Sequence, residues 1–226
     1  MTGKATRGEC TICGKELGKR ALTRHLQAHI ASGEGEPKGK GHVVTMVHLL
    51  VDTRHGSEYW MHVMARGDAT LANLDSFLRE EWLECCDHMS QFKVGGRAYT
   101  SQPDFATWGE GDMDVALADV LGVGQEFTHE YDFGSTTTLR LRVMGTWQGI
   151  PGTLPIKMLA RNEPPERPCI VCGRPADIVC VACYEGPHGT VLCDACAEGH
   201  DCDEDYRLPV VNSPRCGVCG YTGTAW

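Results

Sequence analysis

Residues 169–202 read CIVCGRPADIVCVACYEGPHGTVLCDACAEGHDC, and this stretch decides how the end of the chain folds. A C-x-x-C loop points two thiolates at one point in space, which suits half of a tetrahedral zinc site. About 65 residues with few large apolar side chains cannot build much of a core, so we predict that zinc supplies folding energy here. The candidate ligands suffice for two sites and run in the order Cys169, Cys172, Cys180, Cys183, Cys193, Cys196, His200 and Cys202.

The spacing favours a cross-brace, in which alternating cysteine pairs share a metal ion. The first site would use Cys169, Cys172, Cys193 and Cys196. The second site would use Cys180, Cys183, His200 and Cys202. A sequential pairing is the alternative, and His188 could replace His200. The ligand rhythm resembles B-box and RING-type modules, but a shared fold does not confer ligase activity, so we expect a stabilising or docking module.

The N-terminus carries a second type of metal pattern. Cys10-x2-Cys13-x11-His25-x3-His29 has the ligand order of a ββα, or C2H2-type, zinc finger. The two histidines are four residues apart, so they share one face of a helix and can join the two thiolates on one metal ion. With two sites in the tail, we therefore predict about three Zn²⁺ per chain.

A zinc finger does not always read DNA. If the helix starts near Lys19, the only side chain at a base-facing position that can read a base edge is Arg24. Lys15, Lys19 and Arg20 could contact phosphates, which gives affinity without sequence information. The sequence leaves DNA contact and a docking or purely structural finger as equal alternatives.

Composition and charge limit the class of protein. The 226 residues include 13 Cys, and we see neither a secretory signal nor an apolar run that could span a bilayer, so we expect reduced thiols, bound metal and a cytoplasmic location. The net charge is −9, but residues 1–41 hold eight Lys or Arg against four Asp or Glu. Most of the chain would therefore repel nucleic acid, and only the N-terminal part would attract it.

Two breaks divide the chain. Residues 32–41 (SGEGEPKGKG) have the composition of a flexible linker, and residues 161–168 (RNEPPERP) that of a stiffer spacer. We predict a finger at 1–31, an α+β domain at 42–160 and a Cys-rich zinc module at 169–226. The expected architecture is a small mixed sheet with one main helix, flanked by the finger and the cross-brace-like module.

The middle domain alternates between strand and helix patterns. The apolar residues that follow Thr70 recur at helical spacing, which predicts a helix that runs to about Cys86. Thr70 can cap this helix, since a Thr hydroxyl satisfies a free N–H group at a helix start. Leu139, Leu141 and Val143 alternate with Arg140 and Arg142, which indicates a strand with one solvated face. His48 and His62 are expected on different faces, since a turn intervenes. The predicted strands are 42–51, 58–65, 90–94, 97–101, 127–133 and 138–144, with a short helix at 115–121.

The remaining thiols suggest two further hypotheses. Cys85 and Cys86 end the predicted helix beside His88, and a Cys/His nucleophile there would make the chain an enzyme of unknown chemistry. Alternatively, Cys85, Cys86 or His88 could share a metal ion with Cys216 and Cys219. We find no established catalytic motif, so we predict that the protein is not an enzyme.

The middle of the chain also resembles a known family. LDSFLREEWLECCDHMSQFKVGGRAY and LADVLGVGQEFTHEYDFGSTTTLRLRV are similar to the Ri-plasmid open-reading-frame-three-like domain, also described as an insertion-element passenger protein. The matching positions are Trp82, His88 with Phe92, Leu117 with Asp119 and Leu121, and residues 131–134. The resemblance implies an α+β fold and some association with mobile elements, but no established activity. Ser135 stands where the family usually has an acidic residue.

These patterns together predict a non-enzymatic, zinc-binding adaptor. We expect a protein partner, with no membrane and no small-molecule substrate. The alternative is a DNA-associated accessory protein of a mobile element, which would bind nucleic acid through the finger.

Overall fold

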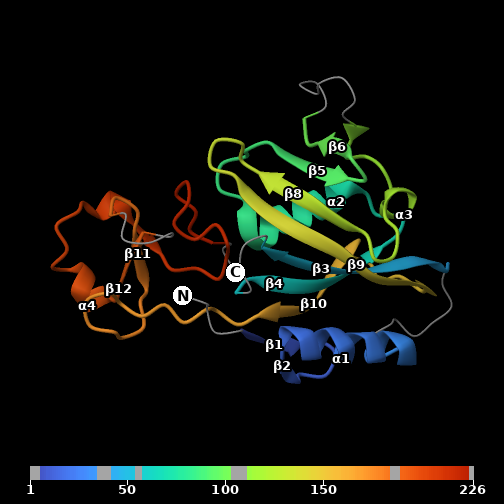
Figure 1. The fold of residues 1–226 in the computed structure, drawn as a ribbon, viewed down its shortest axis with the longest axis horizontal. Helices are drawn as coiled ribbons and strands as arrows, with labels where there is room; N and C mark the ends of the chain where they lie inside the picture. The colour runs from blue at the N-terminus through green and yellow to red at the C-terminus, as the bar shows by residue number, and fades with distance from the viewer. Residues whose placement is uncertain (1–5, 35–41, 54–57, 103–110, 184–188, 224–226) are drawn as a thin grey trace. The chain divides into compact units, whose positions relative to one another are not determined.

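The computed structural model describes residues 6–34, 42–53, 58–102, 111–183 and 189–223 (Figure 1). The chain forms two compact units: Met1–Leu78 with Met89–Glu163, and Arg79–His88 with Pro164–Trp226. This differs from the division predicted from sequence, because the N-terminal segment shares a unit with the middle of the chain, and residues 79–88 belong with the tail. Most of the predicted linker, residues 35–41, lies outside the described residues.

The larger unit is built on one ten-stranded sheet. Its strand order is β2-β1-β10-β4-β3-β9-β8-β5-β6-β7, and every neighbouring pair is antiparallel except β6 with β7. The strands are β1 (Arg7–Cys10), β2 (Glu16–Gly18), β3 (Val44–Thr53), β4 (Trp60–Arg66), β5 (Ser90–Val94), β6 (Arg97–Thr100), β7 (Gly111–Asp112), β8 (Glu126–Tyr131), β9 (Thr137–Gly149) and β10 (Ile156–Asn162).

The larger unit also contains three of the α-helices that the structure describes: α1 (Lys19–Ser32), α2 (Leu71–Leu78) and α3 (Leu117–Val120). In the smaller unit, the π-helix η1 (Arg79–Leu83) precedes the thiols Cys85 and Cys86. The tail adds β11 (Ile178–Cys180), β12 (Thr190–Leu192), α4 (Asp194–Ala197), the 3-10 helix η3 (Glu204–Tyr206) and β13 (Arg207–Pro209), and its sheet has the order β12-β11-β13.

The mixed α and β character predicted from sequence is confirmed, but the expected layout is wrong. Instead of a small sheet with one main helix and a separate ββα finger, the larger unit has more strand than helix, and β1 and β2 form one edge of its ten-stranded sheet. The prediction missed β10, which pairs with both β1 and β4 and so joins the N-terminal segment to the sheet. The strands predicted at 42–51, 58–65, 90–94 and 97–101 are confirmed within two residues. The helix predicted to run from Thr70 to about Cys86 is α-helical only as far as Leu78 and is followed by the π-helix η1.

Packing explains why the N-terminal segment (residues 6–34) is not an independent finger. Leu22 and Leu26 of α1 are fully buried against Trp60 of β4 and Leu159 of β10. A Cβ atom at Gly8 would lie 2.2 Å from the carbonyl oxygen of Arg161, so only glycine lets β1 approach β10 this closely. The small core of the N-terminal segment is therefore continuous with that of the sheet.

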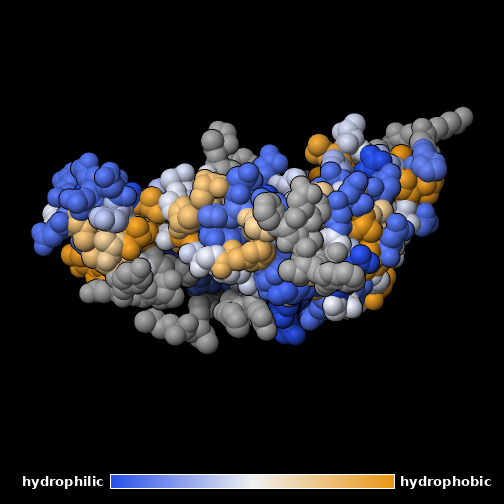
Figure 2. Space-filling model, turned by 90° about the horizontal axis from the view of Figure 1, so that it is seen from above, coloured by the Kyte–Doolittle hydropathy of each residue, from blue (hydrophilic) through white to orange (hydrophobic). Residues whose placement is uncertain are grey.

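The surface is mixed in polarity. On the face drawn in Figure 2, small apolar areas are interspersed with hydrophilic residues among the described residues. The exposed large hydrophobic side chains include Val123, Leu154 and Val171, which belong to different loops. Every helix in the described ranges is too short or too polar to cross a membrane.

Candidate metal centres

Four groups of cysteine and histidine side chains each gather their ligand atoms within 4.8 Å of one another. We call them the N-terminal quartet (Cys10, Cys13, His25, His29), the first tail quartet (Cys169, Cys172, Cys193, Cys196), the second tail quartet (Cys180, Cys183, His200, Cys202) and the fourth quartet (Cys85, Cys86, His88, Cys219). Together they contain every cysteine of the chain except Cys216.

The distances within the quartets suit tetrahedral coordination. Four ligands at ordinary zinc distances place two sulfurs about 3.8 Å apart, and a sulfur and a nitrogen about 3.6 Å apart. The Sγ–Sγ distance is 3.7 Å for Cys85 and Cys86, and 3.6 Å for Cys172 and Cys193. These separations are far longer than the S–S bond of about 2.05 Å in a disulfide. The donor sets therefore fit a metal ion.

The N-terminal quartet joins a turn to a helix. Cys10 ends β1, and Gly14, with φ of +72°, donates its backbone N–H to the carbonyl of Cys10 over 2.8 Å. The two histidines lie one turn apart on α1, with 3.0 Å between their Nε2 atoms. Glu34 accepts a hydrogen bond from Nδ1 of His29, which leaves Nε2 of that ring as the ligand atom.

The first tail quartet repeats the same local turn. The backbone N–H of Gly173, with φ of +73°, donates to the carbonyl of Cys169 over 2.8 Å. Arg174 donates to the sulfurs of Cys172 and Cys193 over 3.5 Å each. Its guanidinium lowers the pKa of Cys172 to about 6, which favours the thiolate that a metal ion requires.

The second tail quartet holds together the ends of the small sheet. Sγ of Cys183 lies 3.3 Å from Sγ of Cys202 and 3.5 Å from Nε2 of His200. Arg207 of β13 donates to the carbonyls of His200 and Cys202 over 2.9 and 2.8 Å, which fixes the loop that carries both ligands. Both tail quartets have the membership that alternating pairs predict, and the alternative ligand His188 lies outside the described residues.

The fourth quartet goes beyond the three sites predicted. Nε2 of His88 lies 3.0 Å from Sγ of Cys86 and 3.2 Å from Sγ of Cys219. The sequence raised a shared site here as a hypothesis, and the structure brings Cys219 to it. Cys216 stays outside the quartet and is instead buried, with its sulfur accepting the backbone N–H of Val211 over 3.5 Å. All four residues of this quartet belong to the smaller unit.

In the fourth quartet, the thiols repel one another when ionised, so they form thiolates together only with a cation bound among them. Hydrogen bonding with Cys85, burial and the nearby Cys219 raise the pKa of Cys86 to about 12, because adjacent thiolates repel one another. The fully buried Arg215 donates from Nη2 to Sγ of Cys85 over 3.4 Å. Three thiolates and one divalent ion carry a net charge of −1, which the guanidinium of Arg215 balances.

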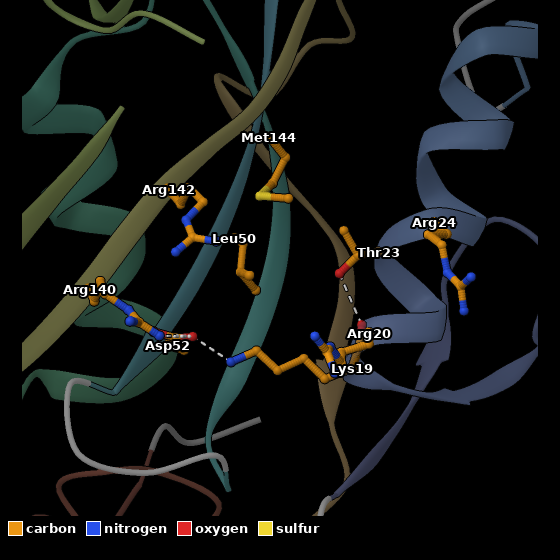
Figure 3. Close-up of a pocket in the computed structure, with 9 residues that line it drawn as sticks. All are labelled: Lys19, Arg20, Thr23, Arg24, Leu50, Asp52, Arg140, Arg142 and Met144. Atoms are coloured by element: carbon orange, nitrogen blue, oxygen red, sulfur yellow. Dashed lines mark hydrogen bonds and ion pairs between the residues drawn. The ribbon is translucent and has the colours of Figure 1, made fainter. Parts of the chain in front are cut away.

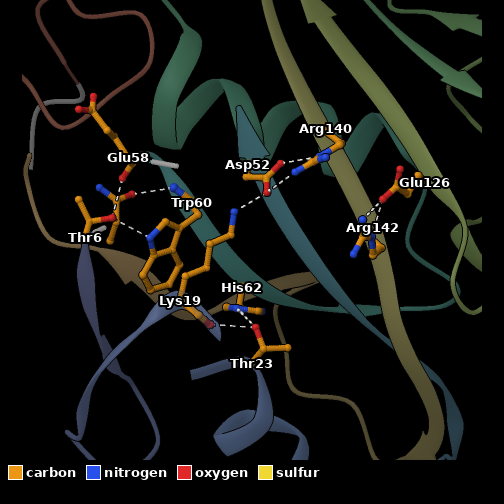
Figure 4. A network of polar contacts seen from close by, with 11 residues as sticks. Thr6, Lys19, Thr23, Asp52, Glu58, Trp60, His62, Glu126, Arg140 and Arg142 are labelled. Carbon is orange, nitrogen blue, oxygen red and sulfur yellow. Dashed lines mark hydrogen bonds and ion pairs between the residues drawn. The ribbon is translucent and has the colours of Figure 1, made fainter. Parts of the chain in front are cut away.

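The structure places three of the four residues predicted to contact nucleic acid on α1 and the fourth in a loop. Lys15 is exposed in the loop between β1 and β2, while Arg20 and Arg24 are exposed on α1. Lys19 is half-buried, and its ammonium group forms an ion pair with the buried Asp52 of β3 (Figure 4). One of the four cations is therefore already held by the protein itself.

A buried histidine pair was missed by the sequence reasoning. His48 lies opposite Met64 and His62 opposite Leu50, so the two histidines are diagonal neighbours on one face of the sheet. Nε2 of His48 lies 3.0 Å from Nδ1 of His62, whose Nε2 lies 3.2 Å from the Thr23 hydroxyl. The expectation that they occupy different faces is wrong. His48 and Leu50 are two positions apart on β3 and so share a face, and His62 lies directly opposite Leu50.

Comparisons with known proteins leave the family open. No family model matches the chain, and no curated protein matches it. A solved protein of unknown function, MM3350 from Methanosarcina mazei Go1, is 14% identical over 49% of this chain and 65% of its own, with a TM-score of 0.42. A similarity at that level carries no argument about this chain. The resemblance to the Ri-plasmid open-reading-frame-three-like domain stays a prediction.

Proposed function

We propose that this protein binds four structural zinc ions and acts by binding other molecules rather than by catalysis. The observation that carries the proposal is that each quartet supplies four protein ligands from the described residues. Four ligands complete a tetrahedral zinc shell and leave no position open for water or substrate. Mixed thiolate and imidazole donors in this geometry favour zinc over calcium or magnesium, which prefer oxygen.

Metal binding would be coupled to folding in the tail. One small core cluster of the tail consists of Cys169, Leu192, Cys193 and Ala197, and two of its four members are themselves candidate ligands. Such a cluster contributes little hydrophobic stabilisation without its metal ion. A reducing compartment such as the cytoplasm would keep these thiols available for zinc.

Native mass spectrometry of the purified chain tests the metal count. We expect four zinc ions in the wild-type protein and three in Cys219→Ala. Cys216→Ala is the matched control, because Cys216 is three residues away but outside the quartet, so this variant retains four. A wild-type count of three, or equal counts in the two variants, would remove the fourth site.

The enzymatic alternative based on Cys86 and His88 has its own test. In the zinc-loaded protein, we expect iodoacetamide to leave Cys86 unmodified, because a metal-bound thiolate is protected, and to modify it after chelation. Selective alkylation of Cys86 with four zinc ions still bound would favour a nucleophile instead.

Nucleic-acid binding through the N-terminal segment, as an accessory protein of a mobile element, is the second candidate function. Arg20 and Arg24 favour it, since both are exposed on α1. The test is binding of mixed-sequence DNA and RNA across a salt series, beside a Cys10→Ser variant. Salt-sensitive binding that the variant loses would support this function, whereas no binding at low salt would leave a protein partner as the proposal.

A further inference from the structure

A cavity of about 610 Å³ lies between helix α1 and strands β3 and β9 of the larger unit (Figure 3). This volume is within the range of small-molecule sites, about 300–1,000 Å³. The helix contributes Lys19, Arg20, Thr23 and Arg24, and the strands contribute Leu50, Asp52, Arg140, Arg142 and Met144.

The lining is strongly basic in a protein that is acidic overall. Five cations and one carboxylate are among the residues that line the cavity, whereas the whole chain has a net charge of −9. The first turn of α1 contains no acidic residue, and its first two residues are Lys19 and Arg20. Cations at a helix N-terminus oppose the helix dipole, so the chain keeps positive charge here at a cost to helix stability.

Ion pairs hold part of this charge in place. The side chain of Asp52 is 4% exposed and accepts hydrogen bonds from Nε and Nη2 of Arg140 over 2.9 Å each. The same carboxylate pairs with Lys19 from the opposite wall, as Figure 3 shows. One carboxylate therefore fixes two cations and leaves a net positive charge between α1 and β9. Pre-positioned groups lose little freedom when a ligand binds.

The other guanidinium groups remain accessible. Arg142 donates from Nε over 2.6 Å, and also from Nη2, to Oε1 of Glu126, and both side chains are nearly half exposed, at 45% and 46%. Arg20 and Arg24 are exposed on α1. A planar guanidinium can donate two parallel hydrogen bonds to phosphate oxygens, which makes arginine well suited to phosphate recognition.

We propose that this cavity binds a compact anion that carries two or more phosphate groups. Arg20 and Arg24 from α1 and Arg142 from β9 would contact the phosphates, while Lys19 and Arg140, fixed by Asp52, supply positive potential behind them.

The lining favours a compact ligand over an extended nucleic acid. Its apolar members are Leu50 and Met144, and the described lining residues include no aromatic ring on which bases could stack. The charge of −9 would repel a long polyanion, whereas a small anion inside the cavity interacts mainly with groups closer than the Debye length of about 8 Å.

Isothermal titration calorimetry of the zinc-loaded chain with inorganic triphosphate tests the proposal, with a mixed-sequence single-stranded 20-mer in a parallel titration. Zinc content is measured before and after, because triphosphate also binds zinc. The test variant is Arg20→Gln with Arg24→Gln. The matched control is Lys15→Gln, which removes a cation from the same segment but outside the cavity.

We expect triphosphate to bind the wild-type protein and Lys15→Gln equally, and the double variant at least about tenfold more weakly, since each charge-assisted contact is worth a roughly ten- to hundredfold change. Absence of triphosphate binding at low salt, or unchanged binding in the double variant, would overturn the proposal. Tighter binding of the 20-mer, with an equal loss in Lys15→Gln, would also overturn it and indicate an extended nucleic-acid surface instead. No residue of the fourth quartet lines the cavity, so these outcomes test the anion site separately from the zinc count.

Discussion

The buried His48–His62 pair should make the larger unit sensitive to mild acid. Burial lowers the pKa of His48 from 6.5 to about 4, and burial together with the charges of His48 and Lys19 lowers that of His62 to about 3. Both imidazoles are therefore neutral in the folded protein at pH 5, whereas both take up protons in the unfolded chain below pH 6.5. The contribution of the neutral pair to stability is therefore present above the unfolded pKa of 6.5, and it is lost as the pH falls from there towards the folded pKa values.

The loss of unfolding free energy at pH 5 depends mainly on the pKa of the two histidines in the unfolded chain. With unfolded pKa values of 6.5, each histidine reduces the free energy of unfolding by about 2 kcal/mol between pH 7.5 and pH 5. Any folded pKa well below 5 gives nearly the same result. The pair together should therefore cost the folded state about 4 kcal/mol over that interval.

Urea denaturation at pH 7.5, 6.5 and 5, followed by tryptophan fluorescence, measures this loss. Acid also weakens zinc binding, so the comparison is between proteins at each pH rather than across pH alone. His48→Leu removes one titrating group and should reduce the pH-dependent loss by about 2 kcal/mol. His42→Leu, at an exposed position, is the control and should keep the wild-type slope. Equal slopes in the wild-type protein and His48→Leu would refute the reasoning.

Three other substitutions test the packing and the metal sites. Leu22→Ala should destabilise the larger unit by about 2–5 kcal/mol, because the side chain is fully buried against the sheet. Gln27→Ala, at an exposed position of α1 with only a 3.5 Å hydrogen bond to the carbonyl of Met144, should change stability by less than about 0.5 kcal/mol, and chemical denaturation distinguishes the two variants. Gly8→Ala should separate β1 from β10, since the new Cβ would meet a carbonyl oxygen at 2.2 Å, and faster amide hydrogen exchange in both strands would report it. Arg215→Met should weaken zinc binding at the fourth quartet about 10- to 100-fold in a chelator competition, because it removes the charge that balances the thiolates, and unchanged affinity would contradict that role.

The sequence predicted local patterns better than their arrangement. Close ligand spacing, as in Cys10 with Cys13 and His25 with His29, is set by a turn or a helix, so both members of such a pair could be read directly. The alternating strand at Arg140 and Arg142 was also identified, and its register predicts one solvated face. What the pattern could not indicate is that this face would lie opposite Arg20 and Arg24 of α1.

Long-range pairing explains the errors. The pairing of β1 with β10 joins residues about 150 positions apart, and nothing in residues 1–31 distinguishes an independent finger from the edge of a sheet. The fourth quartet likewise joins Cys86 to Cys219 across 133 positions, with no regular spacing to reveal it. The positive φ of Asp87, 57°, turns the chain between Cys86 and His88, a feature that the sequence did not indicate.

X-ray absorption at the zinc edge of the purified protein tests the central claim most directly. The four quartets contain twelve sulfur and four nitrogen ligands, so the average zinc ion should have three sulfurs and one nitrogen. The expected distances are about 2.3 Å to sulfur and about 2.0–2.1 Å to nitrogen, with four-coordinate shells. Shells rich in oxygen or an additional water ligand would contradict closed structural sites, and so would a protein that folds fully without any metal.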